Sequence, residues 1–182
     1  MTPFQNRLYK LFKKSLSIFF QEELENIQFG VSERNLSGRL AIYLDRILPK
    51  YYLQDYKADP EYNRMHNGEI KTIVNENMEV IKINCDVIVH SRGENILKDN
   101  LIAIEMKKSN SPQSEKDKDR IRLRALTRRS FDGMWSNDGT THPKHVCGYQ
   151  IGFYMEINIE NRNCLFENYI EGNITETWNA KF

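Results

Sequence analysis

Two short apolar runs, joined by a polar connection, constrain the fold of this chain more than any other feature. The runs are Cys85–His90 and Leu101–Lys107, and the connection between them contains glycine and charged residues. Runs of this length and residue type are typical of neighbouring strands in a sheet. Each run also carries an acid, Asp86 in the first and Glu105 in the second. Because an unpaired buried carboxylate is costly, both acids require partners in the folded protein.

The second run ends in a pattern that places opposite charges together. Side chains two apart in a strand face the same way, so Glu105 and Lys107 project from one side and Met106 projects from the other. A carboxylate and an ammonium at the end of an apolar strand are typical of a metal-dependent hydrolase site. Two alternatives remain open: an ion pair between Asp86 and Lys107 without metal, or a charge ladder on an exposed strand.

The remaining elements follow from periodicity and from helix and turn signals. Apolar residues recur at three- and four-residue spacing in the first twenty residues, which predicts an amphipathic helix. A second helix is predicted to begin at the N-cap Ser32 and to stop at Pro49. The segment at 51–68 is predicted to be mainly irregular. We then expect an antiparallel meander over 70–74, 79–90 and 100–107, a basic helix over about 115–130 that covers the sheet with Ile121, Ala125 and Leu126, and two strands over 147–160 and 164–171.

Length and composition are those of one compact domain. The chain has 182 residues, of which 40% are apolar and 11% aromatic, enough for one sizeable core. We predict a single domain over 1–182, with a helical extension at 1–30, a core at about 31–160 and a carboxy-terminal strand pair that reaches 182. The odd number of cysteines, three, argues against a disulfide framework and a zinc cluster. Short apolar runs and a first segment unlike a signal peptide predict a cytoplasmic protein without membrane contact.

One segment is strongly basic although the formal net charge of the chain is only +1. Residues 107–129 contain nine Lys or Arg and three acids, so a polyanion could dock there. The alternative is a solvated helix face with paired charges. The predicted phosphate contacts are Lys108, Lys116, Arg120, Arg124, Asn63, Arg64 and Arg92.

The combination of these motifs resembles the PD-(D/E)XK nuclease superfamily. Asp86, then Glu105-Met106-Lys107 at the end of the next strand, lie between a helix with an acid at its start and a crossover helix, over about residues 33–156. The segments 59–64, 87–93 and 105–108 are more narrowly similar to uncharacterised bacterial nuclease-like proteins. One departure is Cys85, which stands where the superfamily name expects proline.

The resemblance implies an α/β fold with a restriction-endonuclease-like core, in which helices flank a central mixed β-sheet. It implies that Asp86 and Glu105 hold Mg²⁺, that Lys107 lies beside the attacking water, and that Glu33 corresponds to a helical acid that completes metal binding. The chemistry of Mg²⁺ adds a backbone carbonyl near Met106 to this ligand set, and Mn²⁺ is expected to substitute. The safer role for Lys107 is to orient water and stabilise negative charge, and its role as a base stays open.

We therefore expect a Mg²⁺-dependent endonuclease that acts on DNA more readily than on RNA. Restriction or phage defence is implied by the family alone, and a homodimer or a partner subunit is a further expectation. His90 and Gln150 are candidate outer residues of the site, although structural roles are the simpler interpretation for both. Two alternatives from other classes are a catalytically silent nucleic-acid-binding module and an interaction subunit that docks a partner through its first helix.

Overall fold

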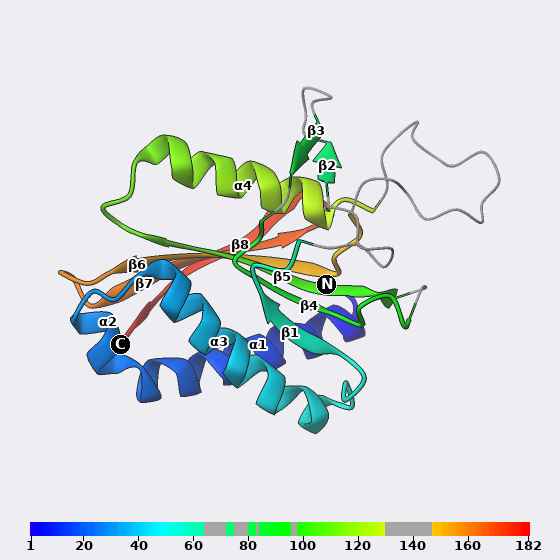
Figure 1. Cartoon of the computed structure of the whole chain (residues 1–182), viewed down its shortest axis with the longest axis horizontal. Helices are drawn as coiled ribbons and strands as arrows, with labels where there is room; N and C mark the ends of the chain where they lie inside the picture. Colours follow the sequence, from blue (N-terminus) through cyan, green and yellow to red (C-terminus); the bar gives the residue numbers. More distant parts are fainter. Residues whose placement is uncertain (64–71, 75–79, 83, 96–97, 130–146) are drawn as a thin grey trace.

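The protein is an α/β protein in which a six-stranded mixed sheet packs against helices (Figure 1). The computed structural model describes residues 1–63, 72–74, 80–82, 84–95, 98–129 and 147–182. Its helices are α1 (Pro3–Glu22), α2 (Leu24–Gln28), α3 (Glu33–Ile47), the short 3₁₀ helix η1 (Leu48–Tyr51) and α4 (Gln113–Thr127). Its strands are β1 (Lys57–Pro60), β2 (Thr72–Val74), β3 (Val80–Lys82), β4 (Val87–His90), β5 (Asn100–Lys108), β6 (Ile151–Asn158), β7 (Asn163–Ile170) and β8 (Asn173–Lys181).

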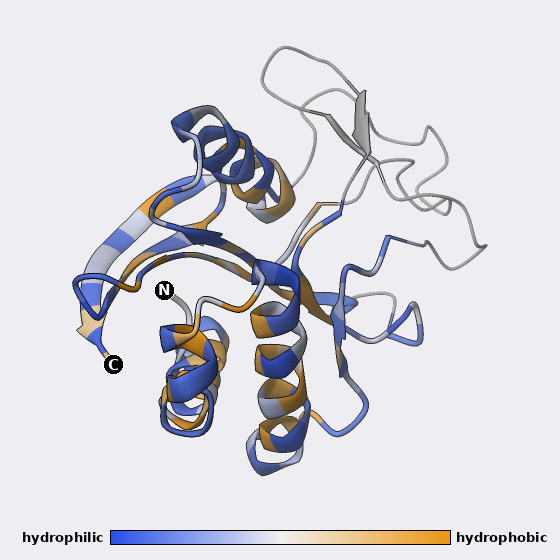
Figure 2. Ribbon diagram, turned by 60° about the vertical axis from the view of Figure 1, so that its left-hand side comes forward, coloured by the Kyte–Doolittle hydropathy of each residue, from blue (hydrophilic) through white to orange (hydrophobic). Residues whose placement is uncertain are grey.

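The main sheet has the strand order β1-β4-β5-β6-β7-β8, and β2 and β3 form a separate two-stranded sheet. Only β5 and β6 are parallel neighbours in the described part of the main sheet. A parallel pair needs a crossover connection, and α4 lies in that connection. Figure 2 shows the result: α4 covers one face of the sheet, whereas α1 and α3 cover the other.

Side-chain alternation along β5 divides the core into two layers. Ile104 and Met106 face α1 and α3, and belong to the larger cluster of buried residues. Ala103 faces α4 and packs in a second cluster with Leu123 and Tyr154. In the larger layer Phe12 of α1 is fully buried and stacks on Phe153 at a ring distance of 3.8 Å. Helix α1 therefore shares its core with the sheet.

Several predicted elements are confirmed. Helices α1, α3 and α4 lie where periodicity placed them, and β4 pairs with β5 in antiparallel fashion. Ser32 is the N-cap of α3, since its side chain accepts a hydrogen bond from the Asn35 amide at 3.2 Å. The α-helix ends at Ile47, two residues before Pro49, and the chain continues as the 3₁₀ helix η1.

Other predictions about the elements are wrong. The single strand predicted over 79–90 is divided into β3 and β4, which belong to different sheets, so no three-stranded meander forms. The segment predicted to be irregular begins with the last residue of η1, Tyr51, and contains β1. Strand β8 was missed because most of its residues are exposed and polar, so it shows no apolar signal. Ile121 is 39% exposed and does not cover the sheet; Leu123 is buried there instead.

The cysteines agree with one expectation from composition. Cys85, Cys147 and Cys164 are all free, which confirms the absence of a disulfide framework. Cys85 and Cys164 are buried, where a thiol packs as a small apolar group. No helix in the described ranges is both long enough and apolar enough to span a bilayer.

The close packing of α4 on the sheet leads to a first prediction about Gly152 in β6. A Cβ atom at this position would lie 2.9 Å from Thr127 Cγ2 and 3.3 Å from Leu123 Cδ2. We expect Gly152→Ala to lower the free energy of unfolding by about 1–3 kcal/mol, because α4 must move away from the sheet. Gly38→Ala in α3 is the matched control: apart from adjoining residues and the helix's own backbone, no atom of the described residues lies within 4 Å of the added Cβ, and the higher helix propensity of alanine should stabilise the protein by up to about 1 kcal/mol.

Urea denaturation of the two variants beside the unchanged protein measures both effects. Equal stabilities of Gly152→Ala and Gly38→Ala would contradict the close contact between α4 and β6.

Candidate active site at the end of strand β5

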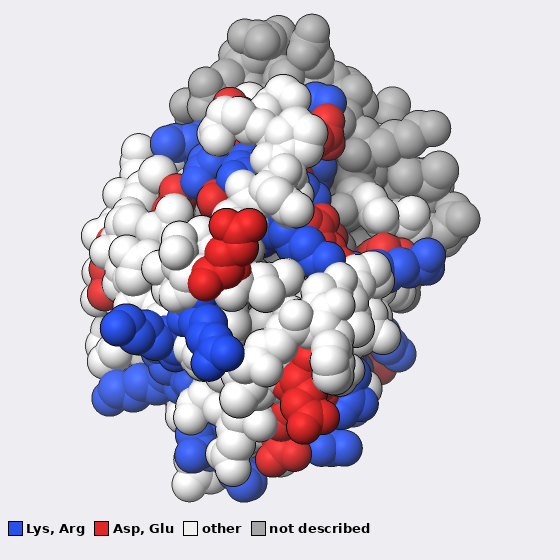
Figure 3. Space-filling view, turned by 90° about the vertical axis from the view of Figure 1, so that its left-hand side faces the viewer, with Lys and Arg blue, Asp and Glu red and all other residues white. Residues whose placement is uncertain are grey.

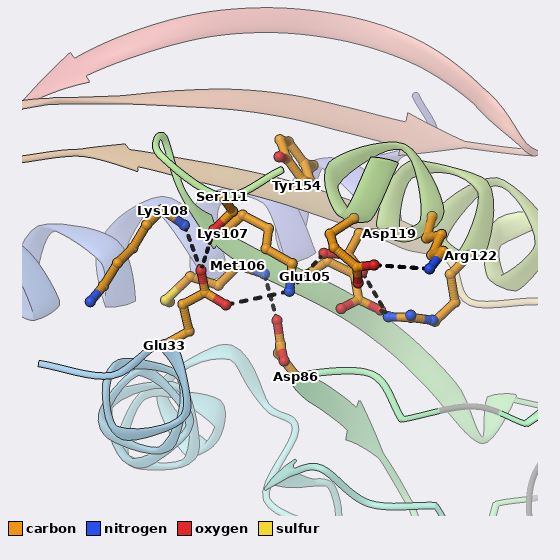
Figure 4. A network of polar contacts seen from close by, with 12 residues as sticks. Glu33, Asp86, Glu105, Met106, Lys107, Lys108, Ser111, Asp119, Arg122 and Tyr154 are labelled. Atoms are coloured by element: carbon orange, nitrogen blue, oxygen red, sulfur yellow. Dashed lines mark hydrogen bonds and ion pairs between the residues drawn. The ribbon is translucent and has the colours of Figure 1, made fainter. Parts of the chain in front are cut away.

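The predicted acids meet where β5 ends. Because β4 runs antiparallel to β5, with Val87 opposite Ile104, the residue that precedes β4 lies beside the end of β5. That residue is Asp86, and its Oδ2 accepts a hydrogen bond of 2.7 Å from the Met106 amide (Figure 4). The convergence of Asp86 with the Glu105-Met106-Lys107 segment, predicted from the sequence, is therefore observed.

Glu33 joins this group from the other side of the sheet. It is the first residue of α3, where the Ser32 cap fixes the start of the helix. Its Oε1 accepts hydrogen bonds from the Lys108 amide at 2.8 Å and from Ser111 Oγ at 3.0 Å. Its Oε2 lies 3.4 Å from Lys107 Nζ. Glu33 thus connects the start of α3 to the end of β5.

Two further residues, both on α4, belong to the site and were missed from the sequence. Asp119 Oδ2 forms an ion pair of 3.2 Å with Lys107 Nζ, and Asp119 Oδ1 lies 3.1 Å from Arg122 Nη1. Arg122 Nη1 also donates a 2.6 Å hydrogen bond to Glu105 Oε1. A signal existed, since Asp119 and Arg122 share a helix face with the buried Leu126 at three- and four-residue spacing. By composition alone, both residues belong to the basic segment 107–129.

The site carries more negative than positive charge. It contains four carboxylates and two cationic side chains, namely Glu33, Asp86, Glu105, Asp119, Lys107 and Arg122. The ammonium of Lys108 is directed elsewhere and donates to the Gly30 carbonyl at 2.7 Å. With all four carboxylates ionised, these six described side chains carry a net charge of −2, which is the charge that one divalent cation would neutralise.

Glu105 is the most confined of these carboxylates. Its side chain is only 1% exposed, and its Oε2 has no hydrogen-bond partner in the described part of the structure. Burial raises the pKa of Glu105 well above its usual range, and the charges of Asp86 and Asp119 raise it further, against the opposing effect of Arg122. An unpartnered buried oxygen of this kind is expensive unless a cation or proton reaches it.

Burial also raises the pKa values of Asp86 and Asp119. Burial raises the pKa of Asp86 to about 6, although the hydrogen bond from Met106 and the charge of Lys107 lower it. Burial likewise raises the pKa of Asp119, with Arg122 and Lys107 opposing the shift. The site therefore holds protons more tightly than separate carboxylates would, and a bound cation would relieve the repulsion among its charges.

Lys107 lies between acids on several sides, as Figure 4 shows. Burial alone would lower its pKa, but Asp119, Asp86 and Glu33 outweigh burial and raise the pKa. Lys107 is consequently an ammonium at neutral pH. This charge state suits a residue that orients water and stabilises negative charge better than one that accepts a proton.

The carboxylate oxygens of the site are of the chemical type that binds a hard divalent cation. Among the described residues no three His, Cys, Asp or Glu side chains are already arranged around a common metal position. Carboxylate oxygens are nevertheless the ligands that Mg²⁺ prefers, and Oε2 of Glu105, near Asp86, supplies one that no described side chain uses. Asp86 and Glu105 would hold the cation, and Glu33 stands at the edge of the same group. A contribution from the Met106 carbonyl stays a prediction.

The basic residues predicted to grip phosphate are mostly engaged inside the protein. Lys116 Nζ pairs with Glu156 at 2.8 Å, and Arg120 pairs with Glu167 at 2.9 Å. Arg124 donates to the Gly172 carbonyl at 3.2 Å. These side chains attach α4 to the sheet, so the structure gives no support to their prediction as phosphate contacts. Figure 3 shows acidic and basic residues interspersed on this end of the molecule, without one broad basic surface.

The two candidate outer residues lie away from the site. His90 is the last residue of β4, whereas Asp86 precedes the strand, so His90 lies four residues further along, about 13 Å away. Its Nε2 lies 3.0 Å from Asp59 Oδ2, and the ring is 1% exposed. The backbone amide of Gln150 donates a hydrogen bond to the carbonyl of Asn100. Asn100 is the first residue of β5, so Gln150 lies at the opposite end of that strand from the site. Both residues make structural contacts away from the site, in agreement with the simpler interpretation.

The other candidate contacts are less informative. Arg92 pairs with Asp59 through two hydrogen bonds of 2.8 and 2.6 Å, which raises the pKa of Arg92 and keeps that of Asp59 low. Arg92 therefore belongs to the Asp59 cluster beside His90. Asn63 is half-buried, and Arg64 lies outside the described residues.

Comparisons of the chain with protein-family models, with curated protein sequences and with solved structures found no match.

Proposed function

We propose that this protein is a metal-dependent nuclease with a restriction-endonuclease-like core, and that it hydrolyses phosphodiester bonds of DNA. The observation that carries the proposal is the group of acids around Lys107, in which a buried oxygen of Glu105 has no partner. Purely structural ion pairs tend to neutralise each other, whereas the six described side chains of this group carry a net charge of −2 when all four acids are ionised. Such an excess is typical of a site that receives a cation.

Each residue has a chemical task in this reaction. When bound, Mg²⁺ or Mn²⁺ would neutralise charge on the phosphoryl oxygens and make water a stronger nucleophile. Asp86 and Glu105 would hold it. The Met106 amide fixes the Asp86 carboxylate, and Asp119 and Glu33 fix the Lys107 ammonium in place. Lys107 would orient the attacking water and stabilise the negative charge that develops on the phosphate.

The biological setting of the proposal comes from the resemblance alone. A nuclease of this superfamily would act on DNA in the cytoplasm, in restriction or phage defence, with RNA as a second substrate. Cutting both strands of a duplex is commonly achieved by a pair of sites, which is the reason to expect a homodimer or a partner subunit.

One observation favours the alternative of a catalytically silent nucleic-acid-binding module. Arg122 already contacts Glu105, so part of the acidic charge is satisfied without metal. In a silent module the ion pairs would serve only to hold α4 against β5. The interaction-subunit alternative receives less support, because the apolar face of α1 is covered by the core of the same chain.

Cleavage assays separate these possibilities. Purified protein is incubated with labelled duplex DNA, single-stranded DNA and RNA, in Mg²⁺, in Mn²⁺ and in chelator. We expect cutting that needs metal and that is lost in Asp86→Ala. Lys118→Ala is the matched control, because Lys118 is 65% exposed and pairs only with Glu115 among the described residues; it should cut normally. Tight binding without cutting in every metal would establish the silent module instead.

A further inference from the structure

Arg122 is placed where it competes with any cation that binds Glu105. Its Nη1 lies 2.6 Å from Glu105 Oε1, and it is the one cationic side chain among the described residues that contacts this carboxylate. The guanidinium is 21% exposed, and the carboxylate is 1% exposed. A metal that binds Glu105 must therefore share it with Arg122 or displace it.

The Arg122 guanidinium also contacts a second acid. Arg122 Nη1 also lies 3.1 Å from Asp119 Oδ1, one helical turn earlier on α4. Figure 4 shows Arg122 directed at both acids. If the contact with Glu105 is lost, the contact with Asp119 still compensates the charge of Arg122, so its release from Glu105 leaves no unpaired buried cation.

We infer that Arg122 occupies Glu105 in the absence of metal, and that a divalent cation binds Glu105 by displacing the guanidinium onto Asp119. This inference rests on the proposed function, since it concerns the regulation of the same site. It accounts for the lack of a preassembled group of metal ligands among the described side chains, because one ligand is held by an internal competitor.

The chemistry of arginine makes this competition persistent. A guanidinium does not lose its proton in a protein, and its contact with Glu105 and Asp119 raises the pKa of Arg122 further, against the effect of burial. Raising the pH therefore cannot remove the competitor, and only its displacement frees Oε1 of Glu105, the oxygen that Arg122 holds. The consequence is a site with weakened affinity for metal.

The test is the affinity for Mn²⁺ of the full chain, measured by isothermal titration calorimetry in the absence of nucleic acid. Arg122→Gln removes the competing charge, so we expect its Kd for Mn²⁺ to fall about tenfold. Arg122→Met, also uncharged, should show the same change. Arg122→Lys keeps a cation at this position and should remain within about threefold of the unchanged protein. Arg124→Gln is the control on the same helix, because Arg124 binds the Gly172 carbonyl and should leave the Kd unchanged.

The outcomes distinguish this inference from the proposed function. Tighter Mn²⁺ binding by Arg122→Gln and Arg122→Met, with Arg122→Lys and Arg124→Gln unchanged, supports the displacement. Equal or weaker binding by both uncharged variants overturns it, and metal-dependent cleavage by the unchanged protein would then leave the nuclease proposal standing. If the unchanged protein neither binds Mn²⁺ nor cuts DNA, and the Arg122 variants bind none either, both proposals fail.

Discussion

Asp86→Asn should abolish cleavage by this protein and at the same time make it more stable at neutral pH. Asparagine has nearly the same size, and its side-chain oxygen can still accept the hydrogen bond from the Met106 amide. What the substitution removes is the negative charge that would bind metal, so we expect activity to fall by about 10³-fold or more. It also removes a charge that is costly to bury.

The pH dependence of stability follows from the raised pKa of Asp86. Burial raises this pKa from 3.8 to about 6, so the folded protein holds the proton more tightly than the unfolded chain does. The stability that the protonated carboxyl contributes is complete below about pH 4 and is lost as the pH rises through 6. At pH 7 Asp86→Asn should therefore be about 1–3 kcal/mol more stable than the unchanged protein, and the difference should shrink toward zero near pH 4.

Urea denaturation between pH 4 and pH 8, without divalent metal, measures this difference. Glu105 and Asp119 also have raised pKa values, but they remain in both proteins, so the difference reports mainly Asp86. Asp117→Asn is the control, because Asp117 is 54% exposed on α4. The difference in unfolding free energy between this variant and the unchanged protein should hardly vary with pH. If Asp86→Asn were less stable than the unchanged protein at pH 7, the conclusion that the buried charge of Asp86 lowers stability would be wrong.

Lys107→Met should have the opposite effect on stability. The ammonium forms ion pairs with Glu33 at 3.4 Å and Asp119 at 3.2 Å, and its charge lowers the pKa of Asp86. Without it, three carboxylates lose their shared cation. We expect a loss of about 2–4 kcal/mol of unfolding free energy, less than for a fully buried pair because 17% of the lysine side chain is exposed. Activity should fall by about 10²-fold or more.

Thermal and urea unfolding at pH 7, together with the cleavage assay, test both effects. Lys118→Met is the matched control, since its side chain is 65% exposed and its single described pair lies on the surface; it should change stability by less than about 1 kcal/mol. Lys107→Arg should recover most of the stability, because it restores the charge, without recovering full activity. If Lys107→Met is as stable as the unchanged protein, the acids do not depend on this lysine.

Together the two variants describe a site that is not arranged for stability. Removing one acid should strengthen the fold, whereas removing the lysine should weaken it. Both follow from the same excess of negative charge around Lys107. Excess charge that is retained at a cost to stability is typical of functional sites, where selection acts on chemistry first.

The parts of the site that depend on local periodicity could be predicted from the sequence. The apolar runs around Asp86 and Glu105 predicted neighbouring strands, and their antiparallel pairing brings Asp86 to the end of β5. The Ser32 cap predicted where α3 begins and hence the position of Glu33. These inferences succeed because strand alternation and helix capping are set by residues close together in the chain.

The pairing of each cation with its acid depends on tertiary packing and could not be predicted from the sequence. From the sequence the arginines and lysines of α4 formed one basic segment, yet Arg122 turns to Glu105, Arg120 to Glu167 and Lys116 to Glu156. The partners lie 17, 47 and 40 residues away in the chain. Helix periodicity specifies the face on which a charge lies, but the pairing depends on how α4 is set across the sheet. That placement is fixed by the packing of the whole core, which no local pattern records.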